Sequence, residues 1–244
     1  MKTLVIIPSR LSATRLPGKP LLKINNISII SHVFKRAKEA NIGEVIVAAE
    51  DQEIIDDVKK NGGNAIITGK NHKTGTDRIY EAFKKLDLKD VDLIMNLQGD
   101  EPNIDIRDIV SLNNFMKSSK ANIGTLASKI NDNNNMYSNE NVVKVITEKV
   151  LEDKNFPIAL NFKRKINEIN NNIYHHLGIY CYSVEALEKF VNLKQSENEI
   201  KNRLEQLRAL DNQQIINVAL ANSSPIGVDT EEDYLAIKKI MEYK

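Results

Sequence analysis

The chain has 244 residues, with 34 Lys and Arg against 33 Asp and Glu, so its formal net charge is +1. This balance excludes the strong overall field on which many nucleic-acid and membrane-surface binders depend, and any electrostatic function must come from local clusters. With 41% hydrophobic residues, the chain can bury a full-sized core in one large domain.

Strand-like and helix-like segments alternate through the first half of the chain. The first strand is the β-branched run 3–7, which we expect Pro8 to stop. Ser28 is the expected N-cap of the first helix, and Gly62 with Gly63 the expected end of the second. Further strands are predicted over 44–49, 65–68 and 91–97, and helices over 29–37, 54–58, 79–86 and 106–116.

This alternation is typical of an α/β fold: a Rossmann-like, mixed but mostly parallel sheet with helices on both faces. Ligands in such folds bind outside the carboxyl ends of the strands. Ser9 and Gly99 each follow a predicted strand end. We therefore expect the motifs around these two residues to meet in one crevice.

The pattern loosens after residue 120, where two asparagine-rich stretches, 131–141 and 167–172, indicate loops. We interpret residues 1–244 as a single domain with an inserted antiparallel element around 121–176. Strands are predicted over 142–150, 157–162, 177–182 and 215–220, and helices over 185–191, 203–210 and 231–241.

Cys181 is the single cysteine, which excludes an internal disulfide and suits a reducing compartment. The apolar run that ends at Pro8 is too short for a signal peptide or a membrane span. We expect a soluble cytoplasmic protein that binds neither nucleic acid nor membrane.

Three cations lie in the loop 9–20: Arg10, Arg15 and Lys19, the last directly after Gly18. Converging cations and a glycine that lets backbone N–H groups approach are what a polyphosphate requires. The loop lacks the P-loop spacing, and the chain has no G-x-G-x-x-G. Physical reasoning alone favours phosphate binding and leaves a solvated basic loop as the alternative.

Seven motifs in order resemble those of the 3-deoxy-manno-octulosonate (Kdo) cytidylyltransferases, which make CMP-Kdo. No single motif would be specific, but the ordered set covers nearly the whole chain. The motifs are PSRLSATRLPGKPL (8–21), TGTDR (74–78), NLQGDEP (96–102), NVVKV (141–145), HLGIY (176–180), LEQLR (204–208) and GVDT (227–230).

The resemblance implies transfer of CMP from CTP to an acidic eight-carbon sugar with release of pyrophosphate, a step of lipopolysaccharide biosynthesis. It implies Arg10, Lys19 and Asp100 as catalytic residues. It implies CTP binding by Ser9, Arg10, Leu11, Arg15, Lys19, Thr74, Gly75, Arg78 and Gln98. Thr76 and Asp77 have a second interpretation, as caps of the helix 79–86.

Asp100 and Asp229 are the candidate Mg²⁺ ligands that the resemblance implies. Each has an ordinary alternative: Asp100 as a turn carboxylate, and Asp229 as a helix N-cap with Glu232 completing a capping box. Mg²⁺ takes one or two carboxylates and completes its shell with phosphate oxygens and water. A nearby triphosphate site therefore favours the metal interpretation for both.

The sugar site implied by the resemblance comprises Gln98, Arg164, His176, Tyr180, Glu205 and Gln206. A structural histidine is the alternative for His176. If Glu205 and Gln206 lay on a helix, their side chains would point about 100° apart. Both would then not reach one ligand.

The chain departs from the family over 159–165, where Asn161 and Lys163 replace the usual Tyr and Ser. This departure leaves open a modified sugar such as 8-amino-Kdo.

The hypothetical mechanism is in-line attack of the sugar's anomeric hydroxyl on the α-phosphorus of CTP, with no dedicated general base identified. The alternatives are a cytidylyltransferase for a nine-carbon sugar acid, a dehydrogenase, which the missing glycine motif argues against, and a catalytically silent nucleotide-binding paralogue. The resemblance also implies a homodimer.

Overall fold

The computed structural model describes residues 1–12, 15–130, 136–166 and 170–242. They form two compact units: unit 1 comprises Met1–Ile109 and Pro225–Lys244, and unit 2 comprises Val110–Ser224. The single-domain interpretation stays a prediction. None of the helices in the described ranges is both long and apolar enough to cross a membrane.

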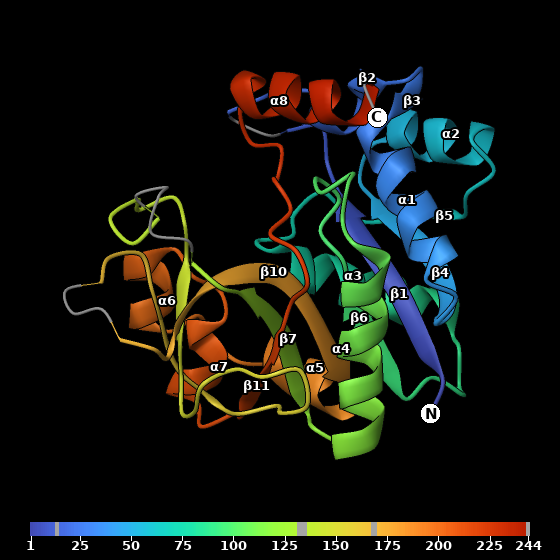
Figure 1. The fold of residues 1–244 in the computed structure, drawn as a ribbon. Helices are drawn as coiled ribbons and strands as arrows, with labels where there is room; N and C mark the ends of the chain where they lie inside the picture. Colours follow the sequence, from blue (N-terminus) through green and yellow to red (C-terminus); the bar gives the residue numbers. More distant parts are fainter. Residues whose placement is uncertain (13–14, 131–135, 167–169, 243–244) are drawn as a thin grey trace. The chain divides into compact units, whose positions relative to one another are not determined.

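Unit 1 contains a four-stranded parallel sheet in the order β6-β1-β4-β5 (Figure 1). The side chains of β1 and β6 are almost entirely buried, as expected for strands covered on both faces. The strands span Thr3–Ser9 (β1), Gly43–Ala49 (β4), Ala65–Ile67 (β5) and Leu93–Asn96 (β6), and the helices between them Ile29–Glu39 (α1), Gln52–Lys60 (α2) and Gly75–Leu86 (α3).

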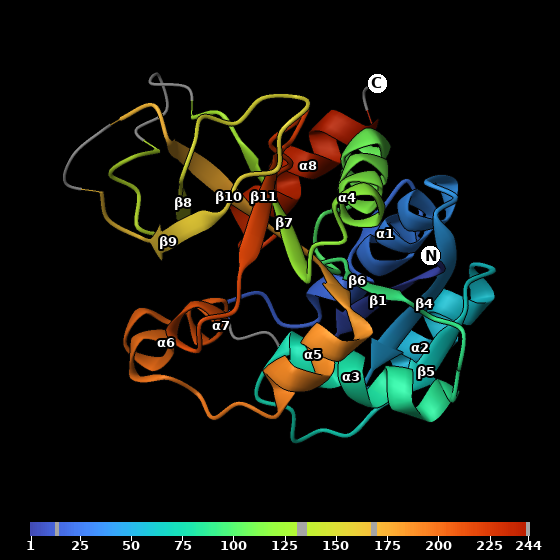
Figure 2. The same ribbon diagram turned by 90° about the horizontal axis from the view of Figure 1, so that it is seen from below.

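Helices cover both faces of this sheet, as the fold-class prediction required. The chain moves outward through β1, β4 and β5 and then returns to β6. Because parallel crossovers are right-handed, this reversal places α3 on the face opposite α1. Figures 1 and 2 show the two helices on opposite sides of β1.

Pro8 does not end the first strand, contrary to our expectation, because β1 pairs with β4 as far as Ser9. The carbonyl of Ile6 accepts a hydrogen bond from Leu97, so Ile6 faces β6. Pro8, two residues on, faces the same side, where the pairing with β6 already ends at Ile6. The missing N–H of proline therefore removes no ladder hydrogen bond.

A small hairpin lies between β1 and α1 and was missed in the sequence. Its strands span Lys23–Ile24 (β2) and Ile27–Ser28 (β3), after a short 3₁₀ helix over Lys19–Leu21 (η1). Asn25 and Asn26 both have positive φ, 48° and 62°, as a two-residue type I′ turn requires. The Asn-Asn pair was the available signal.

Unit 2 carries the mixed part of the fold. Strand β10 is antiparallel to β7 and β8, β8 is antiparallel to β9, and β11 is parallel to β7. The strands span Ile123–Ser128 (β7), Lys144–Thr147 (β8), Ala159–Lys163 (β9), Ile173–Ser183 (β10) and Ile216–Leu220 (β11). The helices of this unit span Val184–Val191 (α5), Glu197–Asn202 (α6) and Leu207–Asp211 (α7). One further helix, Ile106–Ser119 (α4), begins in unit 1 and ends in unit 2.

The helix predicted over 203–210 is confirmed over 207–210, within α7, and is wrong over 203–206. Arg203 adopts a left-handed conformation with φ 53° and ends α6, and α7 begins only at Leu207. Helix α6 was missed although Ser196 and Glu199 form a capping box with the S-x-x-E spacing. Strand β7, fully buried, was also missed, because its short apolar run shows no clean alternation.

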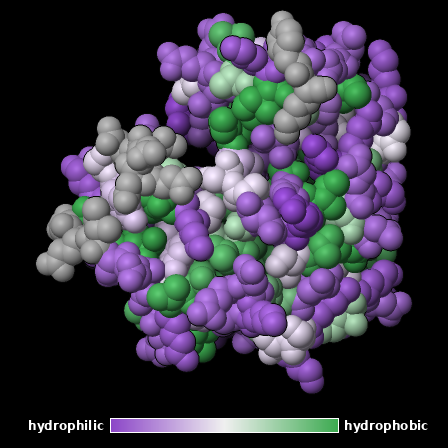
Figure 3. All heavy atoms as spheres, viewed as in Figure 1, coloured by the Kyte–Doolittle hydropathy of each residue, from purple (hydrophilic) through white to green (hydrophobic). Residues whose placement is uncertain are grey.

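The surface is largely hydrophilic on the face drawn in Figure 3, where smaller hydrophobic patches interrupt charged and polar side chains. In unit 2 the exposed large hydrophobic residues include Leu160 on β9 and Ile200 on α6, 59% and 61% exposed. Among the described strands β9 pairs with β8 alone, so Leu160 lies on an edge strand.

Candidate active site

A cluster of charged side chains in unit 1 is centred on the ammonium group of Lys19. Its Nζ lies 2.8 Å from Asp100 Oδ2 and 3.2 Å from Asp229 Oδ1. Arg15 approaches the other oxygen of Asp229 at 3.0 Å. Two carboxylates, one after β6 and one just before the C-terminal helix Glu231–Glu242 (α8), thus converge on one cation.

Backbone and apolar contacts hold this arrangement in place. The N–H of Val228 donates to the carbonyl of Asp100 at 2.9 Å, which sets residues 228 and 229 beside the end of β6. Val228 is fully buried in a cluster with Ile24, Ile29 and Ile237, against which Leu16 also packs. The same cluster therefore fixes Asp229 and the loop that carries Arg15 and Lys19.

The prediction that Asp229 caps α8 is wrong, and this correction affects the charge cluster around Lys19. Thr230, not Asp229, is the capping residue: its Oγ1 accepts from the N–H of Asp233 at 3.2 Å, and the Asp233 carboxylate accepts from the N–H of Thr230 at 2.9 Å. Glu232 is not the partner. The carboxylate of Asp229 is consequently left to contact Lys19 and Arg15.

The pKa values of the site reflect this clustering of charge. Burial alone would lower the pKa of Lys19, but attraction and hydrogen bonding from Asp100 and Asp229 outweigh it and raise that pKa. Burial, together with repulsion from Asp100, Asp108 and Asp229, raises the pKa of Glu101 to about 8. Glu101 is thus mainly neutral at pH 7. The sequence analysis did not identify Glu101 as a neighbour of the two aspartates.

Ser9, Arg10 and Leu11 lie at the carboxyl end of β1. Ser9 ends β1, and its buried Oγ has no hydrogen-bond partner among the described residues. Arg10 is exposed, and the N–H of Leu11 donates to Asp51 Oδ2 at 2.7 Å. Gly99 lies against the same strand end, because a Cβ on it would be 3.0 Å from the carbonyl of Pro8. The expected meeting of the two motifs is confirmed.

The segment 74–78 forms the first turn of α3. Thr74 is the N-cap of α3, and the side chain of Asp77 completes a capping box with it. The predicted capping role is therefore confirmed for Asp77, whereas the N-cap is Thr74 and not Thr76. Gly75 packs on Pro8, where a Cβ would meet the ring at 3.3 Å. The turn therefore lies directly against the end of β1.

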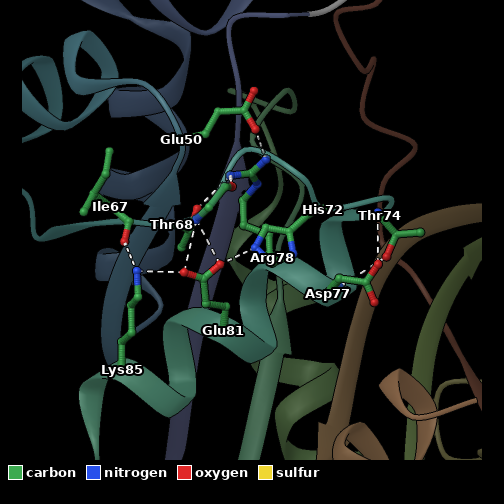
Figure 4. A network of polar contacts seen from close by, with 10 residues as sticks. Glu50, Ile67, Thr68, His72, Thr74, Asp77, Arg78, Glu81 and Lys85 are labelled. Carbon is green, nitrogen blue, oxygen red and sulfur yellow. Dashed lines mark hydrogen bonds and ion pairs between the residues drawn. The ribbon is translucent and has the colours of Figure 1, made fainter.

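The guanidinium of Arg78 is buried and is bound by protein groups. It pairs with Glu50 and donates to Thr68 Oγ1 at 2.7 Å and to the carbonyl of Gly69 at 3.2 Å (Figure 4). Its assignment to CTP stays a prediction. Gln98, half-buried, lies two residues beyond the end of β6.

Asp100 and Asp229 fit a divalent cation. Both are already held around a positive charge, the Lys19 ammonium, and carboxylate oxygens are ligands that Mg²⁺ accepts. No cluster of three or more His, Cys, Asp or Glu suited to a metal occurs in the described part of the chain. Two protein ligands suit a Mg²⁺ ion that fills its shell with phosphate oxygens and water.

The predicted sugar residues all lie in unit 2 except Gln98. His176 is buried, and its Nε2 lies 3.1 Å from Thr125 Oγ1 and 3.0 Å from Tyr180 Oη, with the ring of Phe162 edge-on at 4.9 Å. Burial, with a small contribution from His175, lowers the pKa of His176 to about 3. Burial raises the pKa of Tyr180 well above its usual value.

Arg164 binds backbone rather than side chains. Its guanidinium donates to the carbonyls of Glu140, Asn202 and Arg203 at 3.0, 3.0 and 3.2 Å. Glu205 and Gln206 lie in the turn before α7, so the helical-spacing argument against their reaching one ligand does not apply.

Lys144, buried on β8, was not singled out in the sequence. Its Nζ donates to the carbonyls of Asn139 and Arg164 at 2.6 and 2.7 Å, and burial lowers its pKa.

Comparison with known proteins gives consistent matches along the chain. The family model described as "Cytidylyltransferase" matches residues 4–218. A 3-deoxy-manno-octulosonate cytidylyltransferase from Thermodesulfovibrio yellowstonii is 41% identical, covering 99% of this chain and 98% of the relative. The enzyme of the same description from Bartonella tribocorum is 40% identical over 99% of both chains.

Solved structures agree. A structure of CMP:2-keto-3-deoxy-manno-octonic acid synthetase complexed with CTP has a TM-score of 0.89 and 33% identity, covering 100% of this chain and 99% of that one. A UDP-glucose pyrophosphorylase with a TM-score of 0.71 and 13% identity shares the fold alone. From the full-length matches, the chain belongs to the 3-deoxy-manno-octulosonate cytidylyltransferase family.

Proposed function

We propose that the protein couples CTP to 3-deoxy-manno-octulosonate, giving CMP-Kdo and pyrophosphate. One observation carries the proposal: Lys19, Asp100 and Asp229 converge within hydrogen-bond distance although they come from three distant stretches of the chain. The names of the relatives support the two substrates, and so does the CTP in the complex of the 33% identical synthetase.

In the proposed reaction, the anomeric hydroxyl oxygen of the sugar forms a bond to the α-phosphorus of CTP. The bond between the α-phosphorus and the bridging oxygen breaks, and pyrophosphate leaves with that electron pair, while the hydroxyl proton is released to solvent. Such a transfer depends on alignment and on stabilisation of charge more than on covalent catalysis.

Lys19, Arg15 and Arg10 supply the positive charge in this proposal. Lys19 and Arg15 are held by carboxylates, and a bound triphosphate would offer them stronger phosphate partners. Arg10 is exposed at the end of β1, on the edge of a parallel sheet where ligands bind. The three cations would hold the β- and γ-phosphates and stabilise the leaving pyrophosphate.

We propose Mg²⁺ as the cofactor, with Asp100 and Asp229 as its protein ligands. When bound, the ion would polarise the α-phosphate and neutralise charge on the triphosphate. Asp100 and Asp229 would then exchange the Lys19 ammonium for the metal. Lys19 would be released toward the phosphates.

Kdo is the proposed sugar, and the relatives named for Kdo do not favour an 8-amino analogue. In the altered segment, the amide oxygen of Asn161 accepts the N–H of Phe162 within β9. We further propose a cytoplasmic homodimer that acts in lipopolysaccharide biosynthesis. The edge strand β9 with exposed Leu160 supports pairing through unit 2.

A pyrophosphate-release screen tests this function: CTP, UTP, ATP and GTP against Kdo, 8-amino-Kdo and sialic acid, with and without Mg²⁺. We expect release only with CTP and Kdo, and only with the metal. Faster pyrophosphate release with 8-amino-Kdo than with Kdo would make 8-amino-Kdo the substrate in place of Kdo. Absence of release with every pair, from protein that still binds CTP, would favour a silent paralogue.

A further inference from the structure

Two acidic residues at the carboxyl end of β4, Glu50 and Asp51, have no role in the function proposed above. They lie at the same edge of the parallel sheet as Ser9, the edge where ligands bind in such folds. Their side chains contact two segments that resemble nucleotide-binding motifs.

Asp51 contacts the loop after β1. It is the N-cap of α2, yet its side chain makes no capping hydrogen bond. Asp51 Oδ2 instead accepts the backbone N–H of Leu11 at 2.7 Å. A carboxylate at an N-cap usually accepts N–H groups of its own helix. Here that local stabilisation is given up for a contact 40 positions away in sequence.

Glu50 contacts both segments. Its Oε1 accepts the hydroxyl of Ser12 at 3.3 Å, and its Oε2 pairs with the guanidinium of Arg78, whose side chain is 3% exposed. Through its other terminal nitrogen, Arg78 also holds Thr68 and the carbonyl of Gly69 (Figure 4). A buried guanidinium that keeps its charge needs such an ion pair.

A second carboxylate completes the support of the loop 67–74. Glu81 accepts the N–H of Gly69 at 2.9 Å, contacts His72, and pairs with Lys85, which in turn donates to the carbonyl of Ile67 (Figure 4). The loop leads directly into Thr74, the N-cap of α3. Two side chains of α3 thus hold the loop directly: Glu81, and Arg78, whose guanidinium is paired by Glu50 at the end of β4.

We propose that Glu50 and Asp51 are positioning residues for CTP binding: together they fix the start of the loop 9–20 and, through Arg78, the first turn of α3. The inference rests on the proposed function for the identity of the nucleotide. Neither residue needs to touch the nucleotide. They would act by holding the two segments in their binding conformation before CTP arrives. Without them, the segments would lose conformational entropy on binding, and this loss would weaken the affinity.

The test measures the CTP dissociation constant by titration calorimetry without sugar, on Glu50→Gln, Asp51→Ala and Asp51→Asn. Glu53→Gln, on an exposed side chain of the same helix α2, is the control. We expect Glu50→Gln and Asp51→Ala each to weaken CTP binding by about tenfold, the scale of one hydrogen bond to a charged group. Asp51→Asn should stay within about threefold of wild type, since its amide oxygen still accepts the N–H of Leu11. Glu53→Gln should bind as wild type does.

The calorimetric stoichiometry separates positioning from folding. A residue that only stabilises the fold would lower the fraction of protein that binds and leave the dissociation constant of the remainder unchanged; that result for both Glu50→Gln and Asp51→Ala would overturn the proposal. Should Glu50→Gln not fold, Glu50→Asp keeps the charge but is too short to reach Ser12 and Arg78 together, and it should also weaken binding. Wild-type binding of CTP without pyrophosphate release would refute the proposed function and leave this test valid.

Discussion

The predicted nucleotide residues of unit 1 and the predicted sugar residues of unit 2 differ in what holds them. Lys19 and Arg15 are held by carboxylates, and a charged ligand can replace such partners. Arg164 is held by three backbone carbonyls and His176 by Thr125 and Tyr180. A family motif therefore identifies a residue with a role in the protein. The hydrogen-bond partners of that residue indicate whether its side chain is available to a ligand or stabilises the neighbouring backbone.

The largest expected effect follows from removing either carboxylate around Lys19. Asp100→Asn or Asp229→Asn should lower kcat for pyrophosphate release on the order of 10³-fold, the range found for a lost charge contact in phosphoryl transfer. Both should also raise the Mg²⁺ concentration needed for half-maximal rate. Asp90→Asn, on an exposed side chain, is the control. Rates within a few-fold of wild type in both variants would remove these carboxylates from the site.

Arg164→Ala tests the opposite behaviour in unit 2. Loss of three charge-assisted hydrogen bonds should lower the free energy of unfolding by about 2 kcal/mol without any ligand present. Urea unfolding of the substrate-free protein measures this, with Lys163→Ala on the exposed face of β9 as control. An Arg164 that served only to bind sugar would leave the stability unchanged and raise only KM for the sugar.

The buried His176 predicts a pH dependence of stability. Its pKa is about 3 in the folded protein and about 6.5 when unfolded, so the unfolded chain binds the extra proton in between. The free energy of unfolding should fall as the pH drops below 6.5, by up to about 1.4 kcal/mol per pH unit. In His176→Gln the slope of the free energy of unfolding against pH should be shallower by the contribution of one proton, up to about 1.4 kcal/mol per pH unit. Equal slopes between pH 4 and 6 would show that His176 is accessible and charged.

The smallest expected effect concerns the start of α8 and separates Asp229 from the helix cap. Thr230→Ala should cost about 1 kcal/mol of stability, the usual value of an N-cap. Glu232→Ala should cost nothing measurable. Thermal unfolding of the two variants side by side provides the measurement, and a larger loss for Glu232→Ala would restore the capping box first expected at Asp229.

Much of unit 1 was predictable because its elements are local. Buried β-branched runs and amphipathic helices at regular intervals specify a parallel α/β sheet, and the end of a strand is also the position of the site. Ser9 and Gly99 were placed in this way. Lys19, Asp100 and Asp229 were assigned to one site only through the family resemblance, because a contact between positions 19 and 229 has no local signature.

Unit 2 was harder to predict for a physical reason. The break at Arg203 depends on one residue with positive φ, and the sequence there keeps a helical composition. The partners of Arg164 and Lys144 are backbone carbonyls, which every residue carries and no pattern marks. Glu50 and Asp51 likewise resemble any acidic turn until Leu11 and Arg78 are seen beside them.

The distance in sequence between Lys19 and Asp229, 210 positions, also bears on synthesis of the protein. At roughly 5–20 residues per second, a ribosome needs roughly 10 to 40 s to add the second residue after the first. Throughout that interval the nascent chain lacks one proposed metal ligand. A polypeptide released before residue 229 would lack this carboxylate, so the charge cluster around Lys19 can be completed only after translation has passed that position.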